Sequence, residues 1–361
     1  MADTAQVLEY KCPCCGAGLL FGEEQQKMTC EYCDNTFDLE SVRAFNDAST
    51  EYSDAFIQKD VDSEQWSEDE QESLNCFRCP TCGGEIVTEE HTTATFCPFC
   101  DNPAILPGRL SGGLKPDAIV PFSTGIEDAK KAFHDLCKGK PLLPKGYADE
   151  NRLEKITGIY VPFWLYDCEG MQDTNYRATR IHRWSDFNYI YTRTDHFLLR
   201  RAASANFQHI PMDGSSKFSD TIMESIEPFD YNKMVPFDTA YLSGYFADKY
   251  DVDSTEGRPR IKERVGNTID QLIAPSLVGY NTTIPSGKRL EIRDCSAKYV
   301  LLPVWFLHTR YKDRSYVFAM NGQSGKMTGT FPICPKRSAA WFAGICAGVT
   351  ALVSLIQWLT L

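Results

Sequence analysis

The chain of 361 residues lacks the short motifs that mark several common catalytic sites. It contains no H-E-x-x-H, G-x-S-x-G or G-x-G-x-x-G. The stretch Gly322–Lys326 is too short for a phosphate-binding loop, and no hydroxyl residue follows its lysine. Histidine is scarce, with six residues in the chain. Because no reacting group stands out, we expect a protein that is not an enzyme.

An excess of positive charge is also missing. The formal net charge is −12 and the sequence pI is about 5.1, which opposes binding to a nucleic-acid backbone. One stretch, residues 176–201, departs from this composition and carries six arginines among aromatic residues: Arg177, Arg180, Arg183, Arg193, Arg200 and Arg201. Such a stretch can follow a nucleic-acid strand, cover the solvent face of a sheet, or face anionic lipid or an acidic protein.

Residues 1–10 contain no apolar run, so no signal peptide is expected there. Five cysteines are scattered without a pairing pattern: Cys137, Cys168, Cys295, Cys334 and Cys346. Unpaired thiols fit a reducing compartment better than an oxidising one. We therefore expect a cytoplasmic location for most of the chain and no disulfide framework.

Eight of the 15 cysteines form two sets with the spacing C-x2-C-x14-C-x2-C. Flanking residues match as well, since Gly16 corresponds to Gly83 and Tyr32 to Phe99. Two cysteine turns of this kind supply four thiolates to one tetrahedral zinc ion, with iron as the alternative metal. Four thiolates leave no open coordination position, so we predict two structural Zn²⁺ sites. Their ligands are Cys12, Cys15, Cys30 and Cys33 in the first, and Cys79, Cys82, Cys97 and Cys100 in the second.

Two further cysteines, Cys14 and Cys76, lie beside these turns without a counterpart in the other set. The 67-residue register of the repeat favours Cys12 and Cys79 as the ligands. On this basis we predict a first zinc ribbon at residues 1–40 and a second at residues 76–108. The acidic stretch between them, residues 41–75, is expected to be a solvated linker.

The final apolar stretch, residues 339–361, contains no charged residue. At about 1.5 Å per residue a helix of this length spans a hydrocarbon core of about 30 Å. Trp341 and Trp358 lie near its two ends, and Lys336 and Arg337 precede it. We therefore predict a single-pass transmembrane helix that holds the bulk of the chain on the cytoplasmic side of the plasma membrane. The alternative is a buried core helix.

Residues 117–335 are rich in aromatic residues and are expected to form a mixed α+β body with antiparallel sheet. Strand-like runs occur at 159–166, 188–199, 240–247, 299–308 and 316–320, and helical periodicity occurs at 126–137 and 261–273. Asn321 and Gly322 mark a turn. The segment 120–124 resembles 235–239, and each precedes a helix and a strand with proline and tryptophan. The body therefore has the pattern of two related units.

These features together resemble a bacterial family of TFIIB-type zinc-ribbon membrane proteins. The resemblance covers essentially the whole chain: two C-P-x-C-G…C-x2-C ribbons, the Asn-Gly-Gln-Ser-Gly-Lys turn at residues 321–326, and the final apolar helix. Family members are often labelled as replication-restart helicases. This chain has no Walker A motif and no helicase motor, so that activity is not expected here.

The resemblance implies a function at the membrane. A relative of this kind works with phage-shock protein A and is implied to help recruit that protein and an SPFH-type scaffold protein. By this resemblance the chain is a non-enzymatic, membrane-anchored adaptor for cytoplasmic stress-response proteins. Its ribbon cysteines and terminal helix match the family pattern, whereas no partner-binding motif can be transferred. The alternative function is that of a membrane-tethered nucleic-acid-binding protein.

Overall fold

The computed structural model describes residues 10, 12, 17–22, 27–42, 55–59, 61, 64–67, 74–89, 97–100, 106–108, 113–144, 146–147, 156–311 and 314–360. The chain divides into two compact units. Unit 1 comprises Met1–Asp60, Tyr166–Ile210 and Gly257–Ala297, and unit 2 comprises Val61–Leu165, Pro211–Glu256 and Lys298–Leu361. Each unit is assembled from distant segments because three long strands run through both: β9 (Ile156–Ser185), β10 (Ile190–Asp213) and β13 (Thr282–Tyr311).

Unit 2 is organised around a mixed sheet. Its strand order is β11-β8-β13-β9-β12-β6-β5-β7. The short members are β5 (Leu74–Arg78), β6 (Glu85–Glu89), β7 (Leu106–Gly108), β8 (Ala118–Ile119), β11 (Val235–Pro236) and β12 (Phe246–Asp248). The β11–β8 pair is antiparallel, whereas β8 runs parallel to β13 and β12 runs parallel to β9. Segment 120–124 follows β8, segment 235–239 begins with β11, and these two strands pair with each other.

Helices and a hairpin complete unit 2. The hairpin joins β14 (Arg314–Asn321) to β15 (Met327–Gly329), and the helices are α3 (Ile126–Cys137), α4 (Asp220–Ile226) and the short 3-10 turns η2 (Tyr231–Lys233) and η3 (Thr239–Leu242). Helix α3 begins where the Asp128 carboxylate accepts a hydrogen bond from Gly125 N. Its buried face packs on Phe318 and Met320 of β14. Phe163, Phe306 and Phe218 lie in a second buried cluster.

Unit 1 contains a long antiparallel ribbon and one long helix. Strands β9 and β10 pair, and β4 (Ala55–Gln58) runs parallel to β13. Helix α5 (Arg258–Ile273) is followed by the 3-10 turn η4 (Ala274–Leu277). A Cβ on Gly170 would lie 2.6 Å from Val265, so α5 packs closely on β9 at this point. Asp270 of α5 also accepts hydrogen bonds from Gln172 and Lys288.

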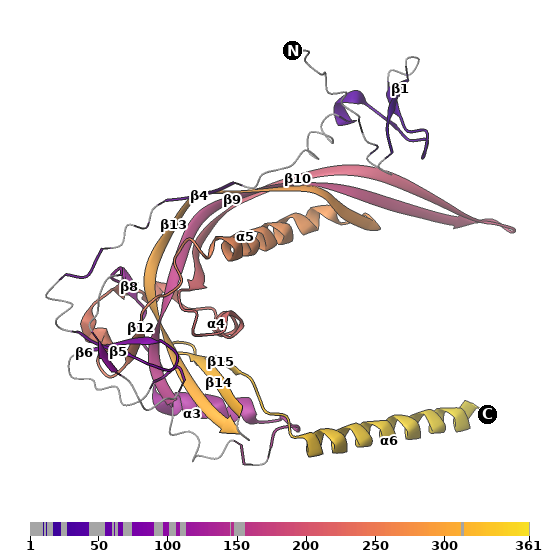
Figure 1. The fold of residues 1–361 in the computed structure, drawn as a ribbon. Coiled ribbons are helices and arrows are strands. Elements are labelled where there is room, and N and C mark those ends of the chain that lie inside the picture. The colour runs from indigo at the N-terminus through magenta and orange to yellow at the C-terminus, as the bar shows by residue number, and fades with distance from the viewer. Residues whose placement is uncertain are drawn as a thin grey trace, which may run out of the picture. The chain divides into compact units, whose positions relative to one another are not determined.

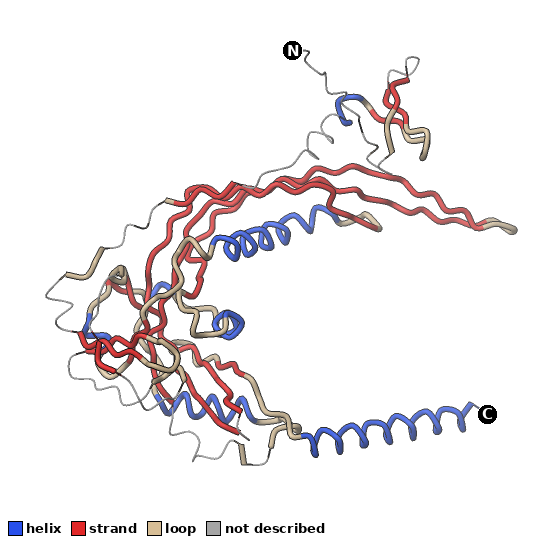
Figure 2. The backbone as a smooth tube through the Cα atoms, in the orientation of Figure 1, coloured by secondary structure: helices blue, strands red, loops and turns tan. Residues whose placement is uncertain are grey.

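The mixed α+β class with antiparallel sheet is confirmed, as the alternation of helices and strands in Figure 2 shows. Helix α3 has the predicted bounds, and Asn321 N donates to Lys326 O in the predicted turn. The expected strand at 240–247 is wrong for most of its length. Asp238 accepts a hydrogen bond from Ala240 N and starts η3, so only residues 246 and 247 are in a strand. Strand β4 lies within the stretch predicted as an acidic linker.

The last helix, α6 (Pro335–Thr360), is long and apolar enough to cross a membrane over Pro335–Trp358. None of this span is buried in the described part of the chain. The described residues therefore do not bury this helix, which argues against the alternative of a buried core helix. Figure 1 shows α6 at the C-terminal end of unit 2.

Candidate metal centres

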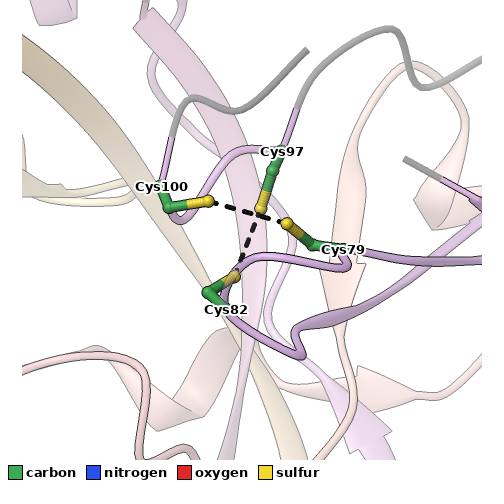
Figure 3. Close-up of side chains that lie close together, drawn as sticks. All are labelled: Cys79, Cys82, Cys97 and Cys100. Atoms are coloured by element: carbon green, nitrogen blue, oxygen red, sulfur yellow. Dashed lines mark hydrogen bonds between the residues drawn. The ribbon is translucent and has the colours of Figure 1, made fainter. Parts of the chain in front are cut away.

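Four cysteine sulfurs of the second ribbon converge on one point (Figure 3). Cys79 and Cys82 lie in the turn between β5 and β6, and Cys97 and Cys100 lie in a second turn before β7. The four sulfurs lie within 4.8 Å of one another. This is the complete set of ligands predicted for the second site.

The sulfur separations suit a metal and not a disulfide. Cys79 Sγ lies 3.6 Å from Cys100 Sγ, and Cys82 Sγ lies 3.6 Å from Cys97 Sγ. Sulfurs that are each about 2.3 Å from one tetrahedral zinc ion stand about 3.8 Å apart. A disulfide would bring them to about 2.0 Å. The donor set and its spacing therefore fit a four-coordinate thiolate site.

Local hydrogen bonds prepare one of these thiols for ionisation. Burial by itself raises the pKa of Cys79, but hydrogen bonds from the backbone amides of Cys82 and Thr81 bring that pKa down to about 7. Burial raises the pKa of Cys97. Since the thiolate is the ligand, a bound cation would favour ionisation of both groups.

Two glycines shape the first turn of this centre. Gly83 has a φ of +72°, which a residue without a side chain adopts at little cost. Its amide donates to Cys79 O, and Cys79 N donates to Gly84 O. A Cβ on Gly84 would lie 2.4 Å from the ring of Phe99. The turn therefore requires glycine at both positions, for conformation at the first and for space at the second.

The first ribbon repeats this arrangement over the residues that the structure describes. It has its own sheet of β1 (Leu20–Gly22), β2 (Lys27–Thr29) and β3 (Thr36–Phe37). Cys12, Cys30 and Cys33 lie together, with Cys12 Sγ 3.6 Å from Cys33 Sγ. Burial raises the pKa of Cys33, but hydrogen bonds from the side chain and backbone of Asn35 lower it to about 7. Cys15, the predicted fourth ligand, lies outside the described residues.

Cys14 and Cys76 are the two additional cysteines beside the ribbon turns. Cys76 is buried in β5, outside the sulfur cluster, and burial raises its pKa. Cys14 lies outside the described residues. The described cluster of the second ribbon thus agrees with the register of the repeat, which favoured Cys79 over Cys76.

The second ribbon is part of the main sheet of unit 2. Strand β6 pairs with β12, where Ala247 lies opposite Val87 and Asp248 lies opposite Ile86. In the turn that carries Cys97 and Cys100, the centre of the Phe99 ring lies 5.5 Å from the centre of the Phe218 ring. This centre is therefore held in place by both backbone pairing and side-chain packing.

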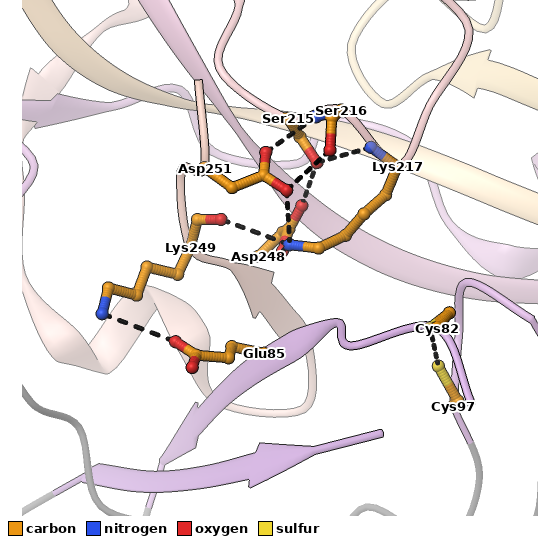
Figure 4. Close-up of polar contacts among 9 residues, drawn as sticks. All are labelled: Cys82, Glu85, Cys97, Ser215, Ser216, Lys217, Asp248, Lys249 and Asp251. Carbon is orange, nitrogen blue, oxygen red and sulfur yellow. Dashed lines mark hydrogen bonds and ion pairs between the residues drawn. The ribbon is translucent and has the colours of Figure 1, made fainter. Parts of the chain in front are cut away.

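A buried polar network reinforces this attachment (Figure 4). Lys217 Nζ donates to Asp248 Oδ1 at 2.6 Å and lies 5.1 Å from the centre of the Phe99 ring. Ser215 Oγ donates to the other carboxylate oxygen of Asp248. Burial raises the pKa of Asp248 to about 6, against the opposing effect of Lys217. Beside this network, Lys249 forms an ion pair with Glu85 of β6.

Reasoning from the sequence missed this network. Its members come from two segments, 215–217 and 248–251, which have no short motif in common. The spacing of the cysteines could find the ligands, because the ligands of each turn are near in sequence. The groups that hold the ribbon are brought together only by the fold.

No family model matches this chain, and no solved structure matches it. The chain is 36% identical over 351 residues to a protein of Bacillus subtilis (strain 168) described as uncharacterized protein YdjG. The matched region covers 97% of this chain and 98% of that protein. The chain belongs to the YdjG family. Because so little of either chain lies outside the matched region, that region spans the positions of both cysteine clusters and most of α6.

Proposed function

We propose that this protein is a non-enzymatic adaptor that recruits cytoplasmic stress-response proteins to the inner face of the plasma membrane. The observation that carries the proposal is the presence, in one chain, of two cysteine clusters and an apolar helix whose apolar span is not buried by the described residues. Small metal-bound modules offer rigid surfaces for partners, and a membrane span fixes where those partners gather.

Zinc is the metal that we propose for both clusters. A shell of four thiolates suits Zn²⁺ and leaves no open position for catalysis. The sulfur spacing of the second cluster supports this, and the first cluster has the same spacing between Cys12 and Cys33. Zinc would then stabilise each ribbon without taking part in a reaction.

The proposed orientation places the apolar stretch 339–361, which includes most of α6, in the plasma membrane, with residues 1–337 in the cytoplasm. Lys336 and Arg337 lie in the first turn of α6, where the positive-inside rule favours the cytoplasmic side. The cysteine-rich ribbons would then lie in the reducing compartment that thiolate sites require.

The first ribbon is the better candidate for docking. Tyr32, which corresponds to Phe99 in the repeat, is 83% exposed, and Leu20 and Phe21 of β1 are exposed as well. In the second ribbon the equivalent Phe99 packs on Phe218. Because one copy of this aromatic position is used for packing inside the protein, we infer that the other copy is used for packing against a partner.

The partners are proposed from the family resemblance alone: phage-shock protein A and an SPFH-type scaffold protein. The test is co-purification of the full-length protein from its native host in mild detergent, followed by mass spectrometry. We expect enrichment of these two classes of protein, and Tyr32→Ser should reduce it about tenfold or more, the cost of losing one well-packed aromatic contact.

Two controls make this test decisive. Cys334→Ser removes a thiol outside both clusters and should leave recruitment unchanged. Cys12→Ser with Cys30→Ser should abolish recruitment while the protein stays in the membrane. Full recruitment by this double variant, or by Tyr32→Ser, would show that the first ribbon is not the docking element.

A further inference from the structure

The tip of the β9–β10 hairpin is exposed over its whole length. Every residue from 181 to 194 is exposed. Several are large and apolar: Ile181, Trp184, Phe187, Tyr189, Ile190 and Tyr191. Trp184 is 52% exposed, Ile190 is 78% exposed, and Phe187 is fully exposed. An apolar group of this size at the end of a ribbon is typical of an interaction surface.

The tip has a defined shape because one carboxylate organises its turn. Asp186 accepts hydrogen bonds from the backbone amides of Asn188 and Tyr189 and from the hydroxyl of Tyr191. These amide bonds hold the pKa of Asp186 below its usual value. The rings of Trp184 and Tyr191 stack, with centres 5.6 Å apart. The aromatic side chains are thus presented by an ordered turn.

The tip and the strands that lead to it carry several arginines in a chain that is acidic overall. Between residues 177 and 201 there are six arginines and two aspartates, whereas the whole chain has a net charge of −12. Of the two aspartates, Asp186 is engaged by the turn and Asp195 pairs with Arg193. Arg200 pairs with Asp173 outside the tip. Within the tip itself the arginines are Arg183 and Arg193, and Arg183 favours an anionic partner.

We propose that the hairpin tip, residues 181–194, inserts its aromatic side chains into the headgroup region of an anionic lipid bilayer. Tryptophan and tyrosine favour the membrane interface, and arginine is attracted to anionic headgroups. The proposal rests on the proposed membrane anchoring, since α6 would keep the protein at such a surface. It adds a second, lipid-selective contact from unit 1.

The test is amide hydrogen exchange on the full-length protein in vesicles of phosphatidylcholine, with or without phosphatidylglycerol. We expect exchange in residues 181–194 to slow about tenfold in the vesicles with phosphatidylglycerol, as burial of a few aromatic side chains would produce. Trp184→Ser with Phe187→Ser should remove this protection, and Arg183→Glu should weaken it. Val278→Ser, at an exposed apolar position elsewhere in unit 1, should retain it.

The exchange of α6 reports the anchoring separately. Protected α6 with equal tip exchange in both vesicles would overturn the second contact and leave the anchor intact. Unprotected α6 with a protected tip would overturn the anchor and support the lipid contact. Tip protection that appears only at high protein density, or only on addition of a single-stranded oligonucleotide, would identify a second copy or nucleic acid as the occupant and overturn the proposal.

Discussion

A single aromatic position of the ribbon repeat has two different environments. Phe99 lies against Phe218 and beneath Lys217, whereas Tyr32 is exposed. The backbone turn that carries each residue is set by the same cysteine spacing. What differs is whether the rest of the fold supplies a surface to cover the ring.

Substitution of these two residues should therefore have unequal effects on stability. Phe99→Ser removes a partly buried ring pair and should lower the free energy of unfolding of unit 2 by about 1–3 kcal/mol. Tyr32→Ser should change stability by less than about 0.5 kcal/mol, because little packing is lost. Chemical denaturation of the zinc-loaded protein measures both values. Equal losses would contradict the packing that we assign to Phe99.

Gly84→Ala tests the close approach of the two turns in the second ribbon. The new Cβ would lie 2.4 Å from the Phe99 ring, so the turns must separate. We expect a loss of about 1–3 kcal/mol in unfolding free energy, together with weaker zinc binding. Competition with a chromophoric chelator measures the affinity. Gly125→Ala, whose Cβ would meet no atom within 3.4 Å, is the control and should bind zinc normally.

At the scale of elements, the two ribbons should respond differently to metal loss. The first has a separate three-stranded sheet, whereas β5, β6 and β7 of the second belong to the sheet of unit 2. Zinc binding supplies much of the folding free energy of such modules. Cys79→Ser with Cys97→Ser should therefore lower the main thermal transition by several degrees or more.

The matched change in the first ribbon, Cys12→Ser with Cys30→Ser, should leave that main transition within about 2 °C of the original protein. Differential scanning calorimetry in the same detergent measures both variants. A main transition that falls equally in the two variants would show that the first ribbon also supports the larger core.

Removal of α6 tests its role as an anchor. A chain ending at Cys334 loses the hydrogen bonds from Arg337 to the backbone of Pro141 and Leu143 but no buried part of the apolar span, and it should fold. We expect it in the supernatant after high-speed centrifugation of a lysate, whereas the full-length protein should sediment with membranes and require detergent for release. Sedimentation of the shortened chain in high salt would contradict α6 as the main attachment.

Local sequence patterns predicted some helices and strands correctly and failed to predict others. Helix α3 could be predicted to its ends because its apolar period and its cap at Asp128 agree. The expected strand at 240–247 failed because Asp238 caps a 3-10 turn that competes with the β-type side chains. The extension of β10 to Asp213 depends on pairing with β9, which no local pattern reveals.

The same distinction applies to the metal centres. Ligand identity follows from cysteine spacing, since each turn contributes two sulfurs a few residues apart. The support given by Asp248, Lys217 and Phe218 comes from residues more than 100 positions downstream of the cysteine turns. The metal ligands of a ribbon can therefore be predicted from cysteine spacing, whereas the contacts that attach the ribbon to the rest of unit 2 cannot.

For the whole molecule, the metal content gives a direct measurement. The intact protein purified without chelators should contain two zinc ions per chain by elemental analysis, because each cluster binds one. Substitution of two cysteines in either cluster should reduce this to one. One ion in the original protein, or iron in place of zinc, would revise the assignment of the clusters.

The long strands that pass through both units also affect how the protein folds during synthesis. The core of unit 2 combines Phe163 of β9 with Phe306 of β13, and β13 is made about 140 residues later. At a translation rate of about 5–20 residues per second, the apolar face of β9 stays uncovered for roughly 7–30 s before β13 is synthesised. We therefore expect the nascent chain to depend on a holding chaperone, such as one that binds extended apolar segments at the ribosome.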